Sequence, residues 1–205
     1  MRVPAETTCV LLRHSSVDNP GNIYYGTEID LPLSDAGREQ ARKLGASLQS
    51  QIGYPSVIIS SPLRRTRETA LLVASVYPSI PVYYDKRLND TRSRHLGGLA
   101  HDWCQKLPDI YDGGGVWGYW IEPKASIATR ITDSVGDWAK QYPGQQLFFV
   151  SSGHPILFFQ WKLNHPHEEF PASSSIRGRL RNGEGIIFRS DELGVLQENF
   201  FSPPG

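Results

Sequence analysis

The chain has few cysteines, no net charge and no long apolar run. Of its 205 residues only two are cysteines, Cys9 and Cys104, and their wide separation indicates neither a disulfide framework nor a zinc site. Basic and acidic side chains both number 21, which argues against nucleic acid or an anionic membrane as a partner bound through bulk charge. No segment approaches the length of a transmembrane helix, and residues 1–8 lack the apolar core of a secretory signal. We therefore expect a cytoplasmic protein in which any affinity for anions comes from a local cluster of side chains.

The length and composition are typical of one globular domain. Hydrophobic residues make up 39% of the chain and charged residues 20%, both ordinary values for such a protein. We predict a single domain over residues 1–205, because no linker divides the sequence. We interpret the aromatic and glycine-rich stretch at about 107–125 as a lid or insertion within that domain.

Short apolar runs alternate with segments of helical periodicity along most of the chain. Apolar runs without a helical period are typical of strands buried on both faces, and they occur at 8–12, 57–59, 82–84 and 147–150. Helices are predicted between them at about 34–48, from Pro62 to just before Tyr77, at 125–141 and at 156–163, and a terminal strand pair is predicted at 186–188 and 195–196. Residues 87–95 are polar and are expected to form a loop. This order predicts an α/β protein, a three-layer α/β/α sandwich with a mostly parallel central sheet.

The first apolar run ends abruptly at Arg13 and His14. Ligands of open α/β sheets bind at the carboxyl ends of the strands, where the strands ending at His14, Ser61 and Ser152 should open on one edge. A guanidinium can bind two phosphate oxygens at once, and a neutral imidazole nitrogen can attack phosphorus or move a proton. This pair therefore indicates a phosphate site, and the alternative is a hydrogen-bonded histidine beside a surface arginine.

Three motifs resemble those of the histidine phosphatase superfamily, which has the phosphoglycerate mutase-like fold, and they follow one another in the same order as in that family. The first is Arg13-His14, with Ser15 in place of the family's glycine. The second lies within 26–41 and the third within 61–70. The resemblance as a whole extends over roughly residues 7–160, and the chain is most similar to the phosphatase branch of the superfamily.

The resemblance implies a role for each matching residue. His14 would be the nucleophile that becomes phosphohistidine, and Arg13 and Arg65 would bind the phosphoryl oxygens. Asp90 stands where the family has a glutamate proton donor, and its side chain is one methylene shorter. Asn19 lies near the position of a phosphate-contacting asparagine, although it could simply be a turn residue.

Two neighbouring positions are expected to behave differently from the motif residues beside them. Arg64 precedes Arg65 at a variable position of the motif, so its side chain is expected to point away from the site. At the end of the fourth strand the family has a second histidine, and an ungapped alignment puts Ser152 there, with His154 two residues later. Either His154 folds back toward the phosphate or Ser152 stands alone, and we expect His154 to reach the edge of the pocket.

The resemblance implies a phosphomonoesterase that acts on a small-molecule or peptide phosphate through phosphohistidine, with no cofactor and no metal. His165 and His167 flank a proline in a polar stretch, and we interpret them as surface residues rather than metal ligands. Two alternatives stay open: a phosphomutase, and a catalytically weakened family member that only binds phosphorylated ligands. Neither the identity of the substrate nor the oligomeric state follows from the sequence.

Overall fold

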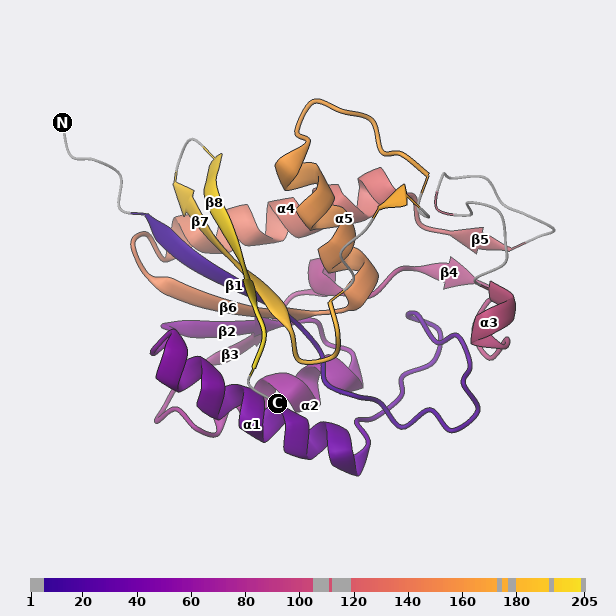
Figure 1. Cartoon of the computed structure of the whole chain (residues 1–205), viewed down its shortest axis with the longest axis horizontal. Helices are drawn as coiled ribbons and strands as arrows, with labels where there is room; N and C mark the ends of the chain where they lie inside the picture. Colours follow the sequence, from indigo (N-terminus) through magenta and orange to yellow (C-terminus); the bar gives the residue numbers. More distant parts are fainter. Residues whose placement is uncertain are drawn as a thin grey trace.

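A six-stranded sheet forms the centre of the protein (Figure 1). The computed structural model describes residues 6–104, 111, 119–172, 175–176, 180–191 and 194–203, and its strand order is β3-β2-β6-β1-β7-β8. Four strands are mutually parallel: β1 (Thr7–Arg13), β2 (Val57–Ser60), β3 (Val82–Tyr84) and β6 (Gln146–Ser151). The hairpin of β7 (Gly185–Asp191) and β8 (Gly194–Phe201) extends the sheet, with β7 antiparallel to β1. The prediction of a mostly parallel sheet is confirmed.

Two long helices cover each face of this sheet (Figure 1). On one face lie α1 (Asp35–Gln51) and α2 (Arg64–Ala74), and on the other lie α4 (Lys124–Gln141) and α5 (Gly153–Asn164). The α/β/α sandwich predicted from the alternation of strands and helices is therefore confirmed. Among the described residues, no helix combines the length and the apolar character needed to cross a membrane.

The sequences of the central strands are continuous apolar runs because both faces of the sheet are buried. Successive side chains of a strand point to opposite faces of the sheet, so the central strands feed two separate clusters. One cluster packs strand residues such as Val10 and Phe148 against Leu44 and Val73 of α1 and α2. The other packs strand residues against α4 and α5, and its members include Cys9, Leu11, Ile59, Phe149, Ile131 and Phe159.

Four short elements lie between the long ones. They are η1 (Lys86–Leu88), β4 (Ser93–Arg94), α3 (His101–Cys104) and β5 (Trp120–Ile121), and β4 pairs with β5 in a small antiparallel sheet. The expected loop at 87–95 thus contains part of a 3₁₀ turn and a short strand. Most of the expected lid at about 107–125 lies outside the described residues, because 105–110 and 112–118 are not part of them.

Two helix starts differ from the sequence prediction. Pro62 was expected in the first turn of α2, but this expectation is wrong: α2 begins at Arg64, because the Ser61 hydroxyl accepts the Leu63 amide at 3.3 Å and Leu63 stays extended. The helix expected from residue 156 begins at Gly153 instead. Pro155 is tolerated in its first turn because amides there have no partner within the helix. His154 therefore lies on the first turn of α5.

Candidate active site

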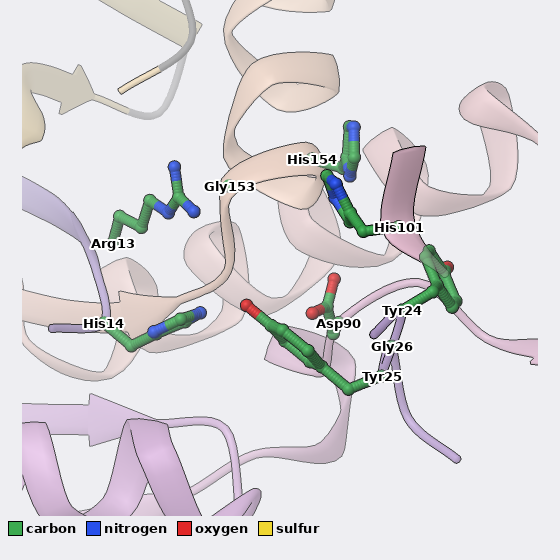
Figure 2. A pocket seen from close by; sticks show the side chains of 9 residues that line it. All are labelled: Arg13, His14, Tyr24, Tyr25, Gly26, Asp90, His101, Gly153 and His154. Carbon is green, nitrogen blue, oxygen red and sulfur yellow. The ribbon is translucent and has the colours of Figure 1, made fainter. Parts of the chain in front are cut away.

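The carboxyl ends of β1, β2 and β6 open on one edge of the sheet, where the structure has a cavity of about 130 Å³. Figure 2 shows the nine residues that line it: Arg13, His14, Tyr24, Tyr25, Gly26, Asp90, His101, Gly153 and His154. They come from the end of β1, the loop before α1, the segment after η1, the start of α3 and the first turn of α5. Segments far apart in sequence are therefore brought together here by the sheet topology.

His14 is held in one orientation at the end of β1. Its amide donates to the Ser151 carbonyl of β6 at 3.0 Å, and its own carbonyl accepts from the Asn182 side chain at 2.9 Å. The ring nitrogen Nδ1 lies 2.8 Å from the Ser15 carbonyl oxygen. A carbonyl can only accept, so Nδ1 carries the proton and Nε2 keeps its lone pair. His14 therefore presents an unprotonated nitrogen.

The surroundings of His14 also keep its ring neutral. The side chain is 1% exposed, and burial lowers its pKa to about 3, with Arg65 and Arg13 adding to the effect. Burial disfavours the imidazolium because it removes the hydration of the charge, and nearby guanidiniums repel that charge. The free site consequently holds a neutral imidazole across the physiological pH range, as a nucleophile requires.

Arg65 is fully buried beside the cavity, whereas Arg64 points to solvent. The Nη2 of Arg65 donates to the Gly26 carbonyl and to Asp90 Oδ2, each at 2.7 Å. Its Nε and Nη1 are buried and have no hydrogen-bond partner within the part of the chain that the structure describes. The Arg64 side chain is 56% exposed and pairs with Glu68. Of these two neighbouring arginines, Arg65 is the one that brings buried, unused donors to this region.

Arg13 lies against the first turn of α5. Its Nη1 donates to the Leu180 carbonyl at 2.6 Å, and its Nε is buried without a partner among the described residues. A Cβ at Gly153 would lie 3.2 Å from that Nε, so the absence of a side chain at 153 lets the guanidinium sit this close to the helix. Gly153 begins α5, and a helix start favours anions because first-turn amides have no partner within the helix.

Asp90 is ionised in the free site. Its Oδ2 bonds to Arg65 and its Oδ1 accepts the Thr91 amide at 2.8 Å. Burial acts to raise the pKa of the carboxyl, but the Arg65 guanidinium and the Thr91 amide outweigh burial, so the pKa lies below its ordinary value. Asp90 thus balances the charge of one arginine and faces the cavity (Figure 2).

Ser152 is buried and does not line the cavity, whereas His154 does. Ser152 follows directly on Ser151, whose carbonyl bonds to His14, so it stands beside the end of β1. It is 1% exposed, and its hydroxyl has no partner among the described residues. His154 lines the cavity from α5, and its Nδ1 lies 3.3 Å from the Tyr111 hydroxyl. Ser152 is therefore buried beside the end of β1, and His154 is one of the residues that line the cavity.

Asn19 does not line the cavity. Its side chain closes its own loop, with Nδ2 donating to the Ile23 carbonyl at 2.9 Å and Oδ1 accepting the Ile23 amide at 3.1 Å. Both polar atoms of the amide are used in this way, which is the turn alternative left open by the sequence.

Sequence reasoning did not find three residues that line the cavity: Tyr24, Tyr25 and His101. The tyrosines directly precede Gly26 of the second motif, and this adjacency was the available signal. His101 carried no signal, because it reaches the cavity only through the pairing of Ile23 with Ala100. Among the described residues, no group of three or more His, Cys, Asp or Glu side chains is placed to hold a metal ion.

The fold and the site are those of an enzyme acting on phosphate esters. Comparison with known proteins gives the family: the model of the histidine phosphatase superfamily, branch 1, matches residues 9–177. The chain belongs to the histidine phosphatase superfamily, so the resemblance noted in the sequence is confirmed, together with the prediction of a phosphatase-type hydrolase.

Relatives and solved structures agree with this assignment. Phosphoglycerate mutase-like protein 4 of Arabidopsis thaliana is 32% identical over 217 residues, which cover 93% of this chain and 90% of that protein. A broad-specificity phosphatase of Saccharomyces cerevisiae is 27% identical over 191 residues, 87% of this chain and 82% of the relative. The structure of Bacillus stearothermophilus YhfR superposes with a TM-score of 0.78 at 22% identity, covering 93% of this chain and 94% of that one. This last likeness shows the shared fold.

Proposed function

We propose that the protein hydrolyses phosphate monoesters through a phosphohistidine on His14. The observation that carries the proposal is the buried, neutral His14, whose Nδ1 is fixed by the Ser15 carbonyl so that Nε2 is free beside two arginines. In the first step Nε2 attacks phosphorus, the bond from phosphorus to the ester oxygen breaks, and the leaving alcohol takes up a proton. In the second step water attacks the phosphohistidine, which releases inorganic phosphate and restores the neutral ring.

Arg13 and Arg65 would stabilise the charge that develops on the phosphoryl oxygens. A monoester carries about two negative charges near neutral pH, and preorganised donors are most effective where water is excluded. The buried Nε of Arg13 and the Nε and Nη1 of Arg65 are donors of this kind. The Gly153 amide at the start of α5 and the Ser152 hydroxyl can add neutral hydrogen bonds.

We assign the leaving-group proton to Asp90. In the free site Arg65 helps to keep this carboxyl ionised, but a bound phosphate dianion competes for the same guanidinium and repels the carboxylate. Both effects raise the pKa of Asp90 and favour the acid form that a proton donor needs. His154, at the edge of the cavity, is the second group that can exchange a proton with the leaving group.

The size of the cavity supports a small-molecule or peptide phosphate as substrate. At about 130 Å³ it is smaller than the roughly 300–1,000 Å³ of pockets that enclose a drug-sized ligand. It therefore suits a phosphoryl group, with the leaving group at the mouth. Names among the relatives fit small substrates: phosphoserine phosphatase 1 of Hydrogenobacter thermophilus and glucosyl-3-phosphoglycerate phosphatase of Mycolicibacterium vanbaalenii.

We further propose one domain over residues 1–205 and a cytoplasmic location. The first strand pairs with both β6 and β7, so the two ends of the chain share one sheet. Cys9 and Cys104 are both free and buried, which is compatible with a reducing compartment. The net charge of zero gives no reason to propose a nucleic acid or a membrane as partner.

One observation favours a second candidate, a protein that binds phosphorylated ligands without turning them over. Ser152 stands beside His14 and carries no charge, and a hydroxyl cannot shuttle a proton near neutral pH. In this alternative the two arginines and the amides of α5 would still hold the ligand.

An assay on p-nitrophenyl phosphate, with wild type beside His14→Ala, separates the two candidates. We expect turnover in the wild type, none in the variant, and a labelled wild-type protein that keeps its phosphate in base and loses it in acid. His14→Ala should still bind inorganic phosphate, because both arginines remain. Turnover by His14→Ala near the wild-type rate would contradict the mechanism, and phosphate binding by an inactive wild type would support the binding protein.

A further inference from the structure

Tyr25 lies between Arg65 and His14, which are both almost fully buried. Its ring centroid is 4.7 Å from Cζ of Arg65, a distance at which a guanidinium is attracted to an aromatic face. Arg65 itself is 0% exposed. The ring therefore covers the guanidinium and leaves its Nε and Nη1 edge, rather than its face, as the part that can meet a ligand.

The backbone around Tyr25 is fixed on both sides, so the ring has a defined position. The Tyr24 amide donates to the Leu99 carbonyl at 2.8 Å, and the Tyr25 carbonyl accepts the Ile29 amide at 3.0 Å. Gly26 follows with a φ of +46°, a conformation that side-chain-bearing residues rarely adopt. Its carbonyl accepts from Arg65 at 2.7 Å. The same short segment is thus tied to Arg65 through a hydrogen bond and through an aromatic ring.

The Tyr25 hydroxyl points toward the ring of His14 across the cavity, as Figure 2 shows. Burial, helped by the Asp90 carboxylate, raises the pKa of this hydroxyl, and Arg65 and Arg13 offset the effect only in part. The group is consequently a phenol at every pH of interest and can donate a hydrogen bond. A phosphoryl group bonded to His14 Nε2 would have its oxygens on the side from which this hydroxyl approaches.

We propose that the Tyr25 hydroxyl donates a hydrogen bond to the phosphoryl group carried by His14, while the Tyr25 ring fixes the plane of the Arg65 guanidinium. The proposal rests on the proposed function for its catalytic part, because it concerns the same phosphoryl group. It makes Tyr25 a residue that contacts substrate, in addition to the motif residues.

The test compares Tyr25→Phe with Tyr25→Leu and uses Tyr83→Phe as the matched control. Tyr25→Phe removes only the hydroxyl, whereas Tyr25→Leu also removes the ring over Arg65. Tyr83 is 45% exposed on β3 and its ring packs against Trp138, away from the cavity. Each variant is measured for kcat/KM on p-nitrophenyl phosphate and, by calorimetry, for the dissociation constant of inorganic phosphate.

We expect Tyr25→Phe to lower kcat/KM by about 10²-fold, the low end for a lost preorganised donor, and to weaken phosphate binding about fivefold. Tyr83→Phe should keep both wild-type values, and Tyr25→Leu should be worse than Tyr25→Phe. Wild-type values for Tyr25→Phe overturn the proposal, including the case in which only Tyr25→Leu is impaired. If the wild type does not turn over, weaker phosphate binding by Tyr25→Phe still supports the contact, and the proposed hydrolysis alone fails.

Discussion

Replacing Arg65 should damage stability and activity through two separable causes. Arg65→Ala leaves Asp90 buried without its partner at 2.7 Å, and removing one member of a buried ion pair costs about 3–5 kcal/mol. It also removes the buried Nε and Nη1 donors, and the loss of one preorganised donor lowers kcat by about 10²–10³. Arg64→Ala, the matched control on the exposed neighbour, should cost at most about 0.5 kcal/mol and leave turnover within about twofold.

The pH dependence and a double variant separate the two causes. In the wild type the pKa of Asp90 is depressed, so its contribution to stability is present above the unfolded pKa and is lost as pH falls. Without Arg65, burial raises that pKa, so acid neutralises the orphan charge. Urea unfolding should therefore show a deficit for Arg65→Ala that shrinks from pH 7 to pH 5. Arg65→Ala/Asp90→Asn should regain stability at pH 7 but not kcat/KM.

Two results would refute this reasoning. Equal losses in Arg64→Ala and Arg65→Ala would mean that the start of α2 does not direct Arg65 alone into the site. A double variant as active as Asp90→Asn by itself would mean that Arg65 acts only by compensating the carboxylate and does not touch the phosphoryl group.

Three further predictions concern the other groups of the site. Asp90→Asn should lower kcat/KM by about 10²–10⁴ for an alkyl phosphate, whose leaving group needs a proton, and only a fewfold for an aryl phosphate; an equal loss on both substrates would point to a positioning role. The pKa of His14 is lowered from 6.5 to about 3, so between these pH values the unfolded chain binds the proton more readily. The free energy of unfolding therefore decreases as the pH is lowered. Wild type should then lose about 1.5 kcal/mol more than His14→Gln between pH 6.5 and pH 5 in urea unfolding, and parallel curves would contradict the depressed pKa. His154→Ala should lower turnover about tenfold while Ser152→His brings no gain; a tenfold gain in Ser152→His with an unchanged His154→Ala would instead assign the position opposite His14 to residue 152.

The long elements could be predicted from the sequence because each follows from a local pattern. The apolar run at 147–150, for example, needs burial on both faces and so predicts β6, whatever the rest of the fold. The short elements follow from distant contacts instead. Glu28 accepts hydrogen bonds from the Ser93 hydroxyl and from the amides of His95 and Gly97. These bonds fix the backbone around β4, in a polar segment whose sequence predicts a loop.

The same distinction applies to the site. His14, Arg13 and Asp90 lie at strand ends or in motifs, so their sequence context places them at the cavity. Tyr25 and His101 line it because the segments around residues 23 and 100 pair across more than seventy positions, and no local pattern reports such a pairing. Sequence predicts which groups carry the chemistry more readily than which groups form the opposite wall.

The central place of β1 has a consequence for how the protein is made. The strand that carries His14 is synthesised before both of its neighbours in the sheet, β6 and β7. Thr8 pairs with Gln146, roughly 140 positions later, so at about 5–20 residues per second the nascent strand waits roughly 7–30 s for its first partner. The Asn182 side chain that binds the His14 carbonyl emerges later still. Throughout that interval an apolar strand with two unpaired edges is exposed on the ribosome, and a chain released before Asn182 lacks the β7–β8 hairpin and the side chain that binds the His14 carbonyl.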